Sequence, residues 1–270
     1  MFIRFIPTPS RSSVGLGPLT VHFYALCILL GIAVAIAVGK SRYKKLGGNP
    51  SEVYDLAIFV IPAGIIGGRF YHVITTPELY FGRSGNFSNA FRIWNGGMGI
   101  WGAVALGTLV SYIFFKVRPR SLGFAQFADA IAPGLLFAQA IGRCGNWFNG
   151  ELFGQPSTLP WALSIPLRDR PVGFEQFATF TPTFLYEALW CLASGFLLLG
   201  LPALKKLRAG NTFLLYIATY CAGRIWIEAL RIDDAHHYLG IRLNDWVAGA
   251  GFLASVVGLT MRSLISEHVS

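Results

Sequence analysis

The chain has 270 residues, of which 54% are hydrophobic and 13% are charged, and its formal net charge is +9. A soluble domain carries about twice that share of charged residues, so this composition excludes an ordinary soluble protein and predicts an integral membrane protein. The basic excess does not indicate nucleic-acid binding, because the Lys and Arg residues gather in short segments between apolar runs, as a membrane topology requires. A single membrane domain over residues 1–270 is expected.

Seven apolar segments are long enough to cross a bilayer, which takes roughly 20 mostly apolar residues. They are expected at about Leu19–Gly39, Val53–Ile74, Gly97–Val117, Phe124–Ile141, Pro182–Pro202, Thr212–Ile232 and Asp245–Leu264. The fourth segment is the weakest candidate, because it is the shortest and contains Asp129 and Pro133. The sequence therefore predicts an all-α polytopic membrane protein with seven transmembrane helices.

Basic clusters orient these helices under the positive-inside rule. They follow the first, third and fifth segments and close the seventh: Lys40, Arg42, Lys44 and Lys45; Lys116, Arg118 and Arg120; Lys205, Lys206 and Arg208; and Arg262. All four fall on one side if the N-terminus lies outside and the C-terminus is cytoplasmic. The long outer connections, at about 75–96 and 150–181, would then form a small extracytoplasmic head or arm. The aromatic residues of the second suit either a half-immersed lid or ordinary interfacial anchors.

The most informative stretch is Gly142–Gly154, which directly follows the apolar run Phe127–Ile141. On a helix, Arg143, Asn146 and Asn149 recur every three residues and lie along one face. Arginine supplies a planar cation suited to phosphate, and glycines let backbone amides approach a ligand. We interpret the stretch as a polar site at the membrane edge that holds an anionic head group. The alternative is a polar helix end anchored at the interface.

Charged residues recur near the same ends of the later segments. Arg224 and Glu228 are four residues apart, so they can pair, and Arg231 is expected on the same helix face. Arg143 and Arg224 are candidates to hold one phosphate together; the alternative is an interhelical lattice of ion pairs. Glu187, one turn inside the fifth segment, is expected to pair with an arginine, because an unpaired carboxylate is costly there.

Three further residues lie near the predicted outer edge. Arg69 either snorkels or binds an anion, and a supporting role is favoured. Tyr24 is either a hydrogen-bond donor to a lipid or peptide or a tyrosine of the aromatic belt, and His22 is a neighbouring candidate. The four cysteines show no disulfide or metal-binding spacing. No zinc motif, nucleotide loop or serine-nucleophile motif occurs, so we expect no metal and no cofactor.

The stretch 142–154 resembles the signature of bacterial prolipoprotein diacylglyceryl transferases, G-R-x-G-N-x-x-N-x-E-x-x-G. All its fixed positions are matched, by Gly142, Arg143, Gly145, Asn146, Asn149, Glu151 and Gly154. The runs Pro182–Ala188 and Arg224–Arg231 resemble further family segments. Gly97 lies in a glycine-rich segment where many members have a histidine proposed as a base. Trp101 occupies that position here, and tryptophan has no basic nitrogen.

The resemblance implies transfer of the diacylglyceryl group from phosphatidylglycerol to the lipobox cysteine thiol of a prolipoprotein, giving a thioether and glycerol phosphate. It implies a bacterial plasma-membrane enzyme, surrounded by membrane lipids. The distribution of basic residues predicts that the site faces the extracytoplasmic leaflet. A small transporter of an anionic substrate is the main alternative, but it would favour a midplane site and internal repeats, which the sequence lacks. A purely scaffolding membrane protein would not need the polar set in 142–154.

Within that reaction, Arg143 and Arg224 are expected to stabilise the charge growing on the departing phosphate. Asn146 would orient the head group together with Tyr24, which matches a functionally important tyrosine of the family. Glu151 either accepts the thiol proton or holds Arg143 in place; of the two candidate bases, Glu151 and His22, it is ranked first. The expected lipid-binding residues are Arg143, Arg224, Asn146, Asn149, Gly154, Glu228 and Arg231. The expected supporting residues are Gly97, Trp101, Glu187, Arg69 and His22.

Overall fold

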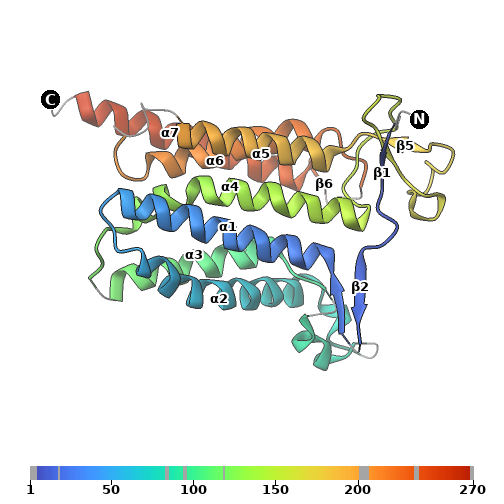
Figure 1. The fold of residues 1–270 in the computed structure, drawn as a ribbon, viewed down its shortest axis with the longest axis horizontal. Helices are drawn as coiled ribbons and strands as arrows, with labels where there is room; N and C mark the ends of the chain where they lie inside the picture. The colour runs from blue at the N-terminus through green and yellow to red at the C-terminus, as the bar shows by residue number, and fades with distance from the viewer. Residues whose placement is uncertain are drawn as a thin grey trace. The chain divides into compact units, whose positions relative to one another are not determined.

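The computed structural model describes residues 5–17, 19–82, 85–93, 96–117, 119–200, 207–233 and 237–267. Three basic residues used to orient the helices, Arg118, Lys205 and Lys206, lie outside the described residues. The chain divides into two compact units, unit 1 with Met1–Gly39 and Ala128–Ser270, and unit 2 with Lys40–Phe127. Figure 1 draws the helices and strands of both units and labels most of them.

The described chain is mostly helical. Its α-helices are α1 (Phe23–Lys45), α2 (Ser51–Thr75), α3 (Ile100–Val117), α4 (Phe124–Asn149), α5 (Thr183–Gly200), α6 (Asn211–Glu228) and α7 (Leu243–Glu267). Six of them, all but α6, are long and apolar enough to cross a membrane. The prediction of a polytopic helical membrane protein is thereby confirmed. The sixth helix is less apolar because it buries polar residues near both ends.

Several helix boundaries differ from the predicted spans: α1 ends at Lys45 instead of Gly39, and α6 ends at Glu228 instead of Ile232. Helix α1 begins at Phe23, because the preceding residues form strand β3 (Leu19–His22), which pairs antiparallel with β2 (Ser13–Leu16). Helix α4 continues to Asn149, two turns beyond its apolar run, so the polar residues spaced by three are helical. The weakest predicted span is thus a helix of 26 residues. In its apolar window 56% of the residues are buried, which makes α4 the most enclosed of the six candidate spans.

Asp129, whose carboxylate made the fourth span the weakest candidate, has hydrogen-bond donors close by. Asp129 accepts hydrogen bonds from the backbone N–H groups of Gly210, at 2.6 Å, and Phe213, at 2.8 Å. These donors belong to the start of α6, where backbone N–H groups have no partner within the helix and the helix dipole favours a negative charge. Asp129 therefore caps α6, and its charge is compatible with a buried position in α4.

Helices α1 and α4 run antiparallel in unit 1, and glycines let them approach closely. A Cβ atom added at Gly134 would lie 2.8 Å from the carbonyl oxygen of Ala35. One added at Gly145 would lie 2.6 Å from the ring of Tyr24. Small residues at such an interface allow the backbone-to-backbone contact that holds membrane helices together. This packing brings the start of α1 against the end of α4.

The connection between α4 and α5 folds into a small head with the N-terminal strand. Strand β4 (Leu163–Ser164) lies between β1 (Ile6–Pro7), to which it is parallel, and β5 (Thr179–Phe180), to which it is antiparallel. The apolar core of the head consists of Phe153, Leu163, Ile165, Phe180 and Phe184. Trp161 of this connection donates a hydrogen bond of 2.9 Å from Nε1 to the Tyr186 hydroxyl of α5. The head is therefore fastened to the helices of unit 1.

Helices α2 and α3 of unit 2 meet at paired glycines. A Cβ atom at Gly67 would lie 2.3 Å from the carbonyl oxygen of Gly102, which is backbone and cannot turn aside. We expect Gly67→Ala to lower the free energy of unfolding in detergent by about 1–3 kcal/mol, as overpacking does. Gly64→Ala, one turn earlier, is the matched control, because its new Cβ would lie 4.0 Å from its neighbour. An equal loss in both variants would contradict this explanation.

Candidate active site

The predicted site residues of unit 1 gather at one end of its helices. Helices α1, α5 and α7 begin at this end, and α4 and α6 end there, beside the head (Figure 1). The alternating direction of successive helices therefore brings Arg143 of α4, Glu187 of α5 and Arg224 of α6 together, although they are far apart in sequence.

Glu187 joins two of the predicted arginines. Its Oε1 lies 2.6 Å from Arg143 Nη2, and its Oε2 lies 3.0 Å from Arg224 Nη1. The first contact is an ion pair without the geometry of a directed hydrogen bond. The Glu187 side chain is only 5% exposed, so its charge would be costly without these partners. The predicted pairing of Glu187 is confirmed, and Arg143 and Arg224 converge on one carboxylate.

Glu228 is the centre of a second set of ion pairs. Its Oε2 accepts from Arg224 Nη2 and lies 3.3 Å from Arg231 Nη1. Its Oε1 lies 3.1 Å from Arg242 Nη1 and accepts from Asn244 Nδ2 at 3.0 Å. The predicted Arg224–Glu228 pair is confirmed. Arg231, which was expected on the same helix face, lies beyond the helix, because α6 ends at Glu228.

Three residues of this network were not predicted from the sequence. Arg242 is the last residue of strand β7 (Ile241–Arg242) and Asn244 is the second residue of α7, and both contact Glu228. Asp233 accepts from Arg231 Nε at 2.6 Å and from Arg231 Nη2 at 2.7 Å. One signal was present in the sequence, since in the predicted orientation Arg242 precedes the seventh span on the outer side, where the positive-inside rule does not favour basic residues. An arginine in that position needs another explanation, and pairing with Glu228 provides it.

Among the arginines of this network, Arg143 has the fewest ion-pair partners. Its only ion-pair partner among the described residues is Glu187, which it shares with Arg224. Its side chain is 20% exposed, against 13% for Arg224 and 9% for Arg231. Arg143 is therefore the arginine of this set that an anion can reach most easily. The alternative expectation, an interhelical lattice of ion pairs, is what these contacts show. Binding of one phosphate by Arg143 and Arg224 stays a prediction.

The asparagines of the signature hold its glutamate. Glu151 Oε1 accepts from Asn146 Nδ2 at 2.9 Å and from Asn149 Nδ2 at 3.0 Å. Asn146 is buried, whereas Glu151 is exposed. Arg143 Nη1 reaches Asn146 Oδ1 at 3.4 Å, so Glu151 is linked to Arg143 through an amide. Two amide donors therefore hold the exposed Glu151 carboxylate without neutralising it.

Tyr24 lies beside this arrangement at the start of α1. Its ring rests against Gly145, whose lack of a side chain makes the contact possible. His22 is exposed at the end of β3, two residues earlier. The structure thus brings Tyr24 to the signature and leaves His22 at the surface.

Comparison with known proteins places this arrangement in a family. The sequence profile of the prolipoprotein diacylglyceryl transferase family matches residues 11–261. The chain belongs to this family.

Several relatives named phosphatidylglycerol–prolipoprotein diacylglyceryl transferase are similar over nearly the whole chain. The protein of Cutibacterium acnes is 51% identical over 252 residues, which are 93% of this chain and 84% of the relative. That of Bifidobacterium adolescentis is 48% identical over 269 residues, or 95% of this chain and 80% of the relative. That of Streptomyces avermitilis is 48% identical over 265 residues, which are 97% of this chain and 76% of the relative. The resemblance expected from the sequence is confirmed, and so is the class of enzyme, a transferase.

Gly154, the last fixed position of the prolipoprotein diacylglyceryl transferase signature, has a spacing role here. A Cβ atom at Gly154 would lie 2.4 Å from the carbonyl oxygen of Leu230, and Gly154 forms a β-bridge with Arg231. The head therefore lies directly on the segment that follows α6. Lipid binding by Gly154 stays a prediction.

The supporting residues predicted from the glycine-rich segment lie in unit 2. Arg69, which is 7% exposed, donates to backbone carbonyl oxygens of Asn89, Ala90, Arg92, Gly96 and Gly97. Its donors thus organise the connection between α2 and α3, in agreement with the favoured supporting role. A Cβ atom at Gly97 would lie 2.7 Å from Arg69 Nη1. Trp101 is the second residue of α3 and is 40% exposed; its part in the reaction stays a prediction.

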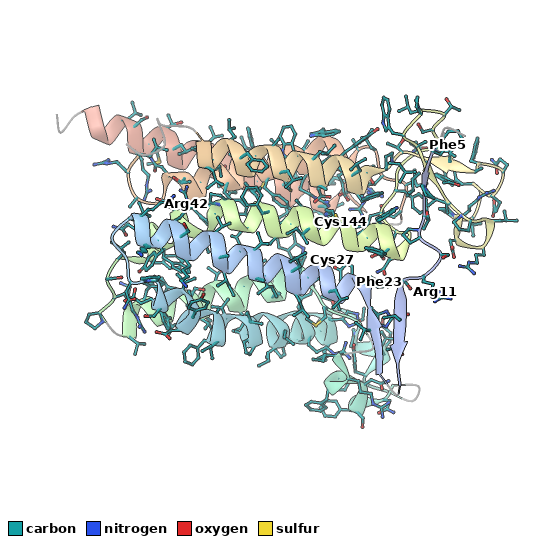
Figure 2. All side chains as sticks on the ribbon, in the orientation of Figure 1. Phe5, Arg11, Phe23, Cys27, Arg42 and Cys144 are labelled. Carbon is teal, nitrogen blue, oxygen red and sulfur yellow. The ribbon has the colours of Figure 1, made fainter. Side chains whose placement is uncertain are left out.

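The cysteines of this family member are free thiols. Cys191 and Cys221 are buried, as expected of small apolar residues, and Cys27 is half-buried. Cys144, inside the signature, is exposed, and its Sγ lies 3.8 Å from the carbonyl oxygen of Ala140 one turn earlier. Figure 2 shows Cys144 on α4 and Cys27 on α1.

Proposed function

We propose that this chain transfers the diacylglyceryl group of phosphatidylglycerol to a cysteine thiol of a prolipoprotein, with the ion pairs around Glu187 as the seat of the reaction. The cysteine sulfur attacks the glycerol carbon next to the phosphate. The carbon–oxygen bond to the phosphate breaks, and glycerol phosphate leaves with the electron pair. The observation that carries this assignment to the site is the convergence of Arg143 and Arg224, from two helices, on one carboxylate.

Arg143 and Arg224 act on the phosphate. Negative charge on the phosphate oxygens grows as the carbon–oxygen bond breaks, so fixed cations stabilise the transition state more than the bound lipid. Each guanidinium carries five N–H donors in a rigid plane, and Glu187 uses one nitrogen of each. The remaining donors of Arg143 are the more accessible, because this side chain is more exposed. Glu187 fixes the distance between the two cations before the lipid arrives.

Glu151 accepts the proton of the cysteine thiol. A free thiol has a pKa near ~8.5, so only a few per cent of it is ionised at neutral pH. Glu151 is exposed and held by Asn146 and Asn149, which keeps its second oxygen available to a substrate group. Tyr24, packed against Gly145, adds a hydroxyl group that orients the lipid head group.

The site faces the extracytoplasmic leaflet in this proposal, with seven membrane spans and the N-terminus outside. Basic residues in the last turn of α1, Arg42, Lys44 and Lys45, lie at the opposite end of that helix from Tyr24 and support this orientation. Helix α6 is the seventh span. Its Arg224 and Glu228 are compatible with a membrane position, because ion pairs and the Asp129 cap of its first turn compensate its polar groups.

A direct assay tests the proposed reaction. Purified protein in vesicles of phosphatidylglycerol should add one diacylglyceryl unit to a lipobox peptide, detected as a mass gain on the cysteine residue. A peptide with serine in place of that cysteine should gain no mass. Absence of the product with the cysteine peptide, under conditions where a family member from another bacterium forms it, would contradict the proposal.

Glu151→Gln tests the proposed base. The glutamine carbonyl oxygen can still accept from Asn146 and Asn149, so the substitution removes the basic group and retains the local hydrogen bonds. Without a base the reaction depends on the thiolate already present, so we expect transfer at pH 7 to fall by about thirtyfold and to recover largely near pH 9. The pH–rate profile of the variant is the measurement. A profile parallel to that of the wild type would show that Glu151 does not accept the proton.

A further inference from the structure

A polar contact lies deeper between α4 and α6 than the ion pairs. Gln139 Nε2 donates a hydrogen bond of 3.0 Å to the Tyr216 hydroxyl. Gln139 precedes Arg143 by one helical turn, which places it on the same face of α4 and about 6 Å further into the bundle. Tyr216 precedes Arg224 by two turns on α6. The pair therefore continues the polar side chains of the proposed site toward the apolar interior of the helices.

The hydrogen bonds of this pair are incomplete. Gln139 Oε1 is buried and has no partner among the described residues. Tyr216 accepts from Gln139, but its own O–H contacts no acceptor within the described part of the chain. If the Gln139 amide is turned over, Tyr216 donates to the oxygen and both amide N–H groups are left over. Either orientation leaves at least one donor without an acceptor.

A hydrogen-bond donor without an acceptor in apolar surroundings costs free energy of folding. The hydrogen bond between α4 and α6 therefore does not by itself explain why both polar residues lie here. The surroundings are apolar, since Tyr216 packs against the core cluster of Leu136, Ala140 and Cys191. Its ring also stacks on Tyr220, with ring centroids 6.3 Å apart. The stacked ring holds the hydroxyl in place, which suits a group that must meet a ligand.

We propose that Gln139 and Tyr216 bind an acyl-ester carbonyl of the donor lipid and so position the glycerol carbon that the thiol attacks. This inference rests on the proposed function, because it requires the lipid phosphate to lie at Arg143 and Arg224. An ester carbonyl only accepts hydrogen bonds, which matches the donor left over by the pair. In a phospholipid the ester groups follow the phosphate by a few covalent bonds, on the side of the acyl chains. Gln139 likewise lies one helical turn from Arg143 in the direction in which the acyl chains would extend.

The test compares two lipids and two variants. Wild-type protein, Tyr216→Phe and Gln139→Leu are assayed for transfer to a lipobox peptide from diester phosphatidylglycerol and from its diether analogue, which lacks the ester carbonyl groups. The wild type should prefer the diester lipid by about threefold to tenfold in kcat/KM, the effect of one hydrogen bond. In both variants this preference should fall to about one, because they lose rate on the diester lipid and little on the diether lipid. Tyr112→Phe is the control, since Tyr112 is an exposed tyrosine of α3.

The outcomes separate this inference from the function on which it rests. A wild type without preference between the two lipids would overturn the ester site, whatever the variants do. Variants that transfer more slowly from both lipids by the same factor would also overturn it and would indicate a packing role. A buried water molecule that completes the hydrogen bonds of the pair would overturn it as well. Failure of the wild type to transfer from diester phosphatidylglycerol would instead reject the proposed function itself.

Discussion

Arg143→Ala is expected to slow diacylglyceryl transfer from phosphatidylglycerol by about a hundredfold to a thousandfold. That is the usual effect of removing one fixed donor that stabilises transition-state charge. Arg143 is the more exposed of the two arginines on Glu187 and has no other ion-pair partner among the described residues, so its loss removes the cation most accessible to the phosphate. The measurement is turnover of a lipobox peptide at saturating lipid.

Two further variants sharpen this test. Arg143→Lys keeps the charge but loses the planar fork, so it should recover only part of the rate. Arg168→Ala is the matched control, because Arg168 is 77% exposed in the head and pairs with the neighbouring Asp169; its rate should equal that of the wild type. Unchanged turnover in Arg143→Ala would reject the phosphate role of this residue.

Glu228→Gln is expected to give the largest loss of stability. The Glu228 side chain is 1% exposed and contacts Arg224, Arg231 and Arg242. Neutralising it leaves buried cations short of a counter-charge, and breaking a buried pair in this way costs about 3–5 kcal/mol. The free energy of unfolding should fall accordingly in denaturant titrations of the protein in detergent.

Asp169→Asn provides the control for this second variant. Asp169 is a carboxylate in the exposed pair of the head, 44% exposed, and surface pairs contribute little. No resolvable change in the unfolding midpoint is expected. If Glu228→Gln were as stable as Asp169→Asn, the ion pairs around Glu228 could not be what joins α6 to the start of α7.

The local features of the site could be predicted from the sequence because they depend on spacing within one helix. The interval of four residues predicts the Arg224–Glu228 pair, and the interval of three places Arg143, Asn146 and Asn149 on one face of α4. Apolar length likewise located all seven helices, but it ended the first and the fourth too early, because α1 and α4 both continue into polar residues. The start of the first helix also differs, because Leu19–His22 pair with β2 and form a strand instead of a first helical turn.

The contacts between helices could not be predicted, because they join residues far apart in the chain. Nothing in the sequence around Glu187 indicates that it receives an arginine from α4 and another from α6. Asp129 makes the fourth span the weakest prediction for the same reason, since its partners are backbone N–H groups at the start of α6, which no side-chain pattern shows. The contact of Arg242 with Glu228 could not be predicted either, because the two residues are 14 apart in the chain and belong to different elements.

A structure of the protein with bound phosphatidylglycerol tests the central claim most directly. The account predicts one phosphate group with oxygen atoms within about 2.7–3.2 Å of guanidinium nitrogens of both Arg143 and Arg224, while Glu187 stays in contact with each of them. A lipid phosphate bound elsewhere, with Arg143 and Arg224 paired to Glu187 as they are without lipid, would contradict it.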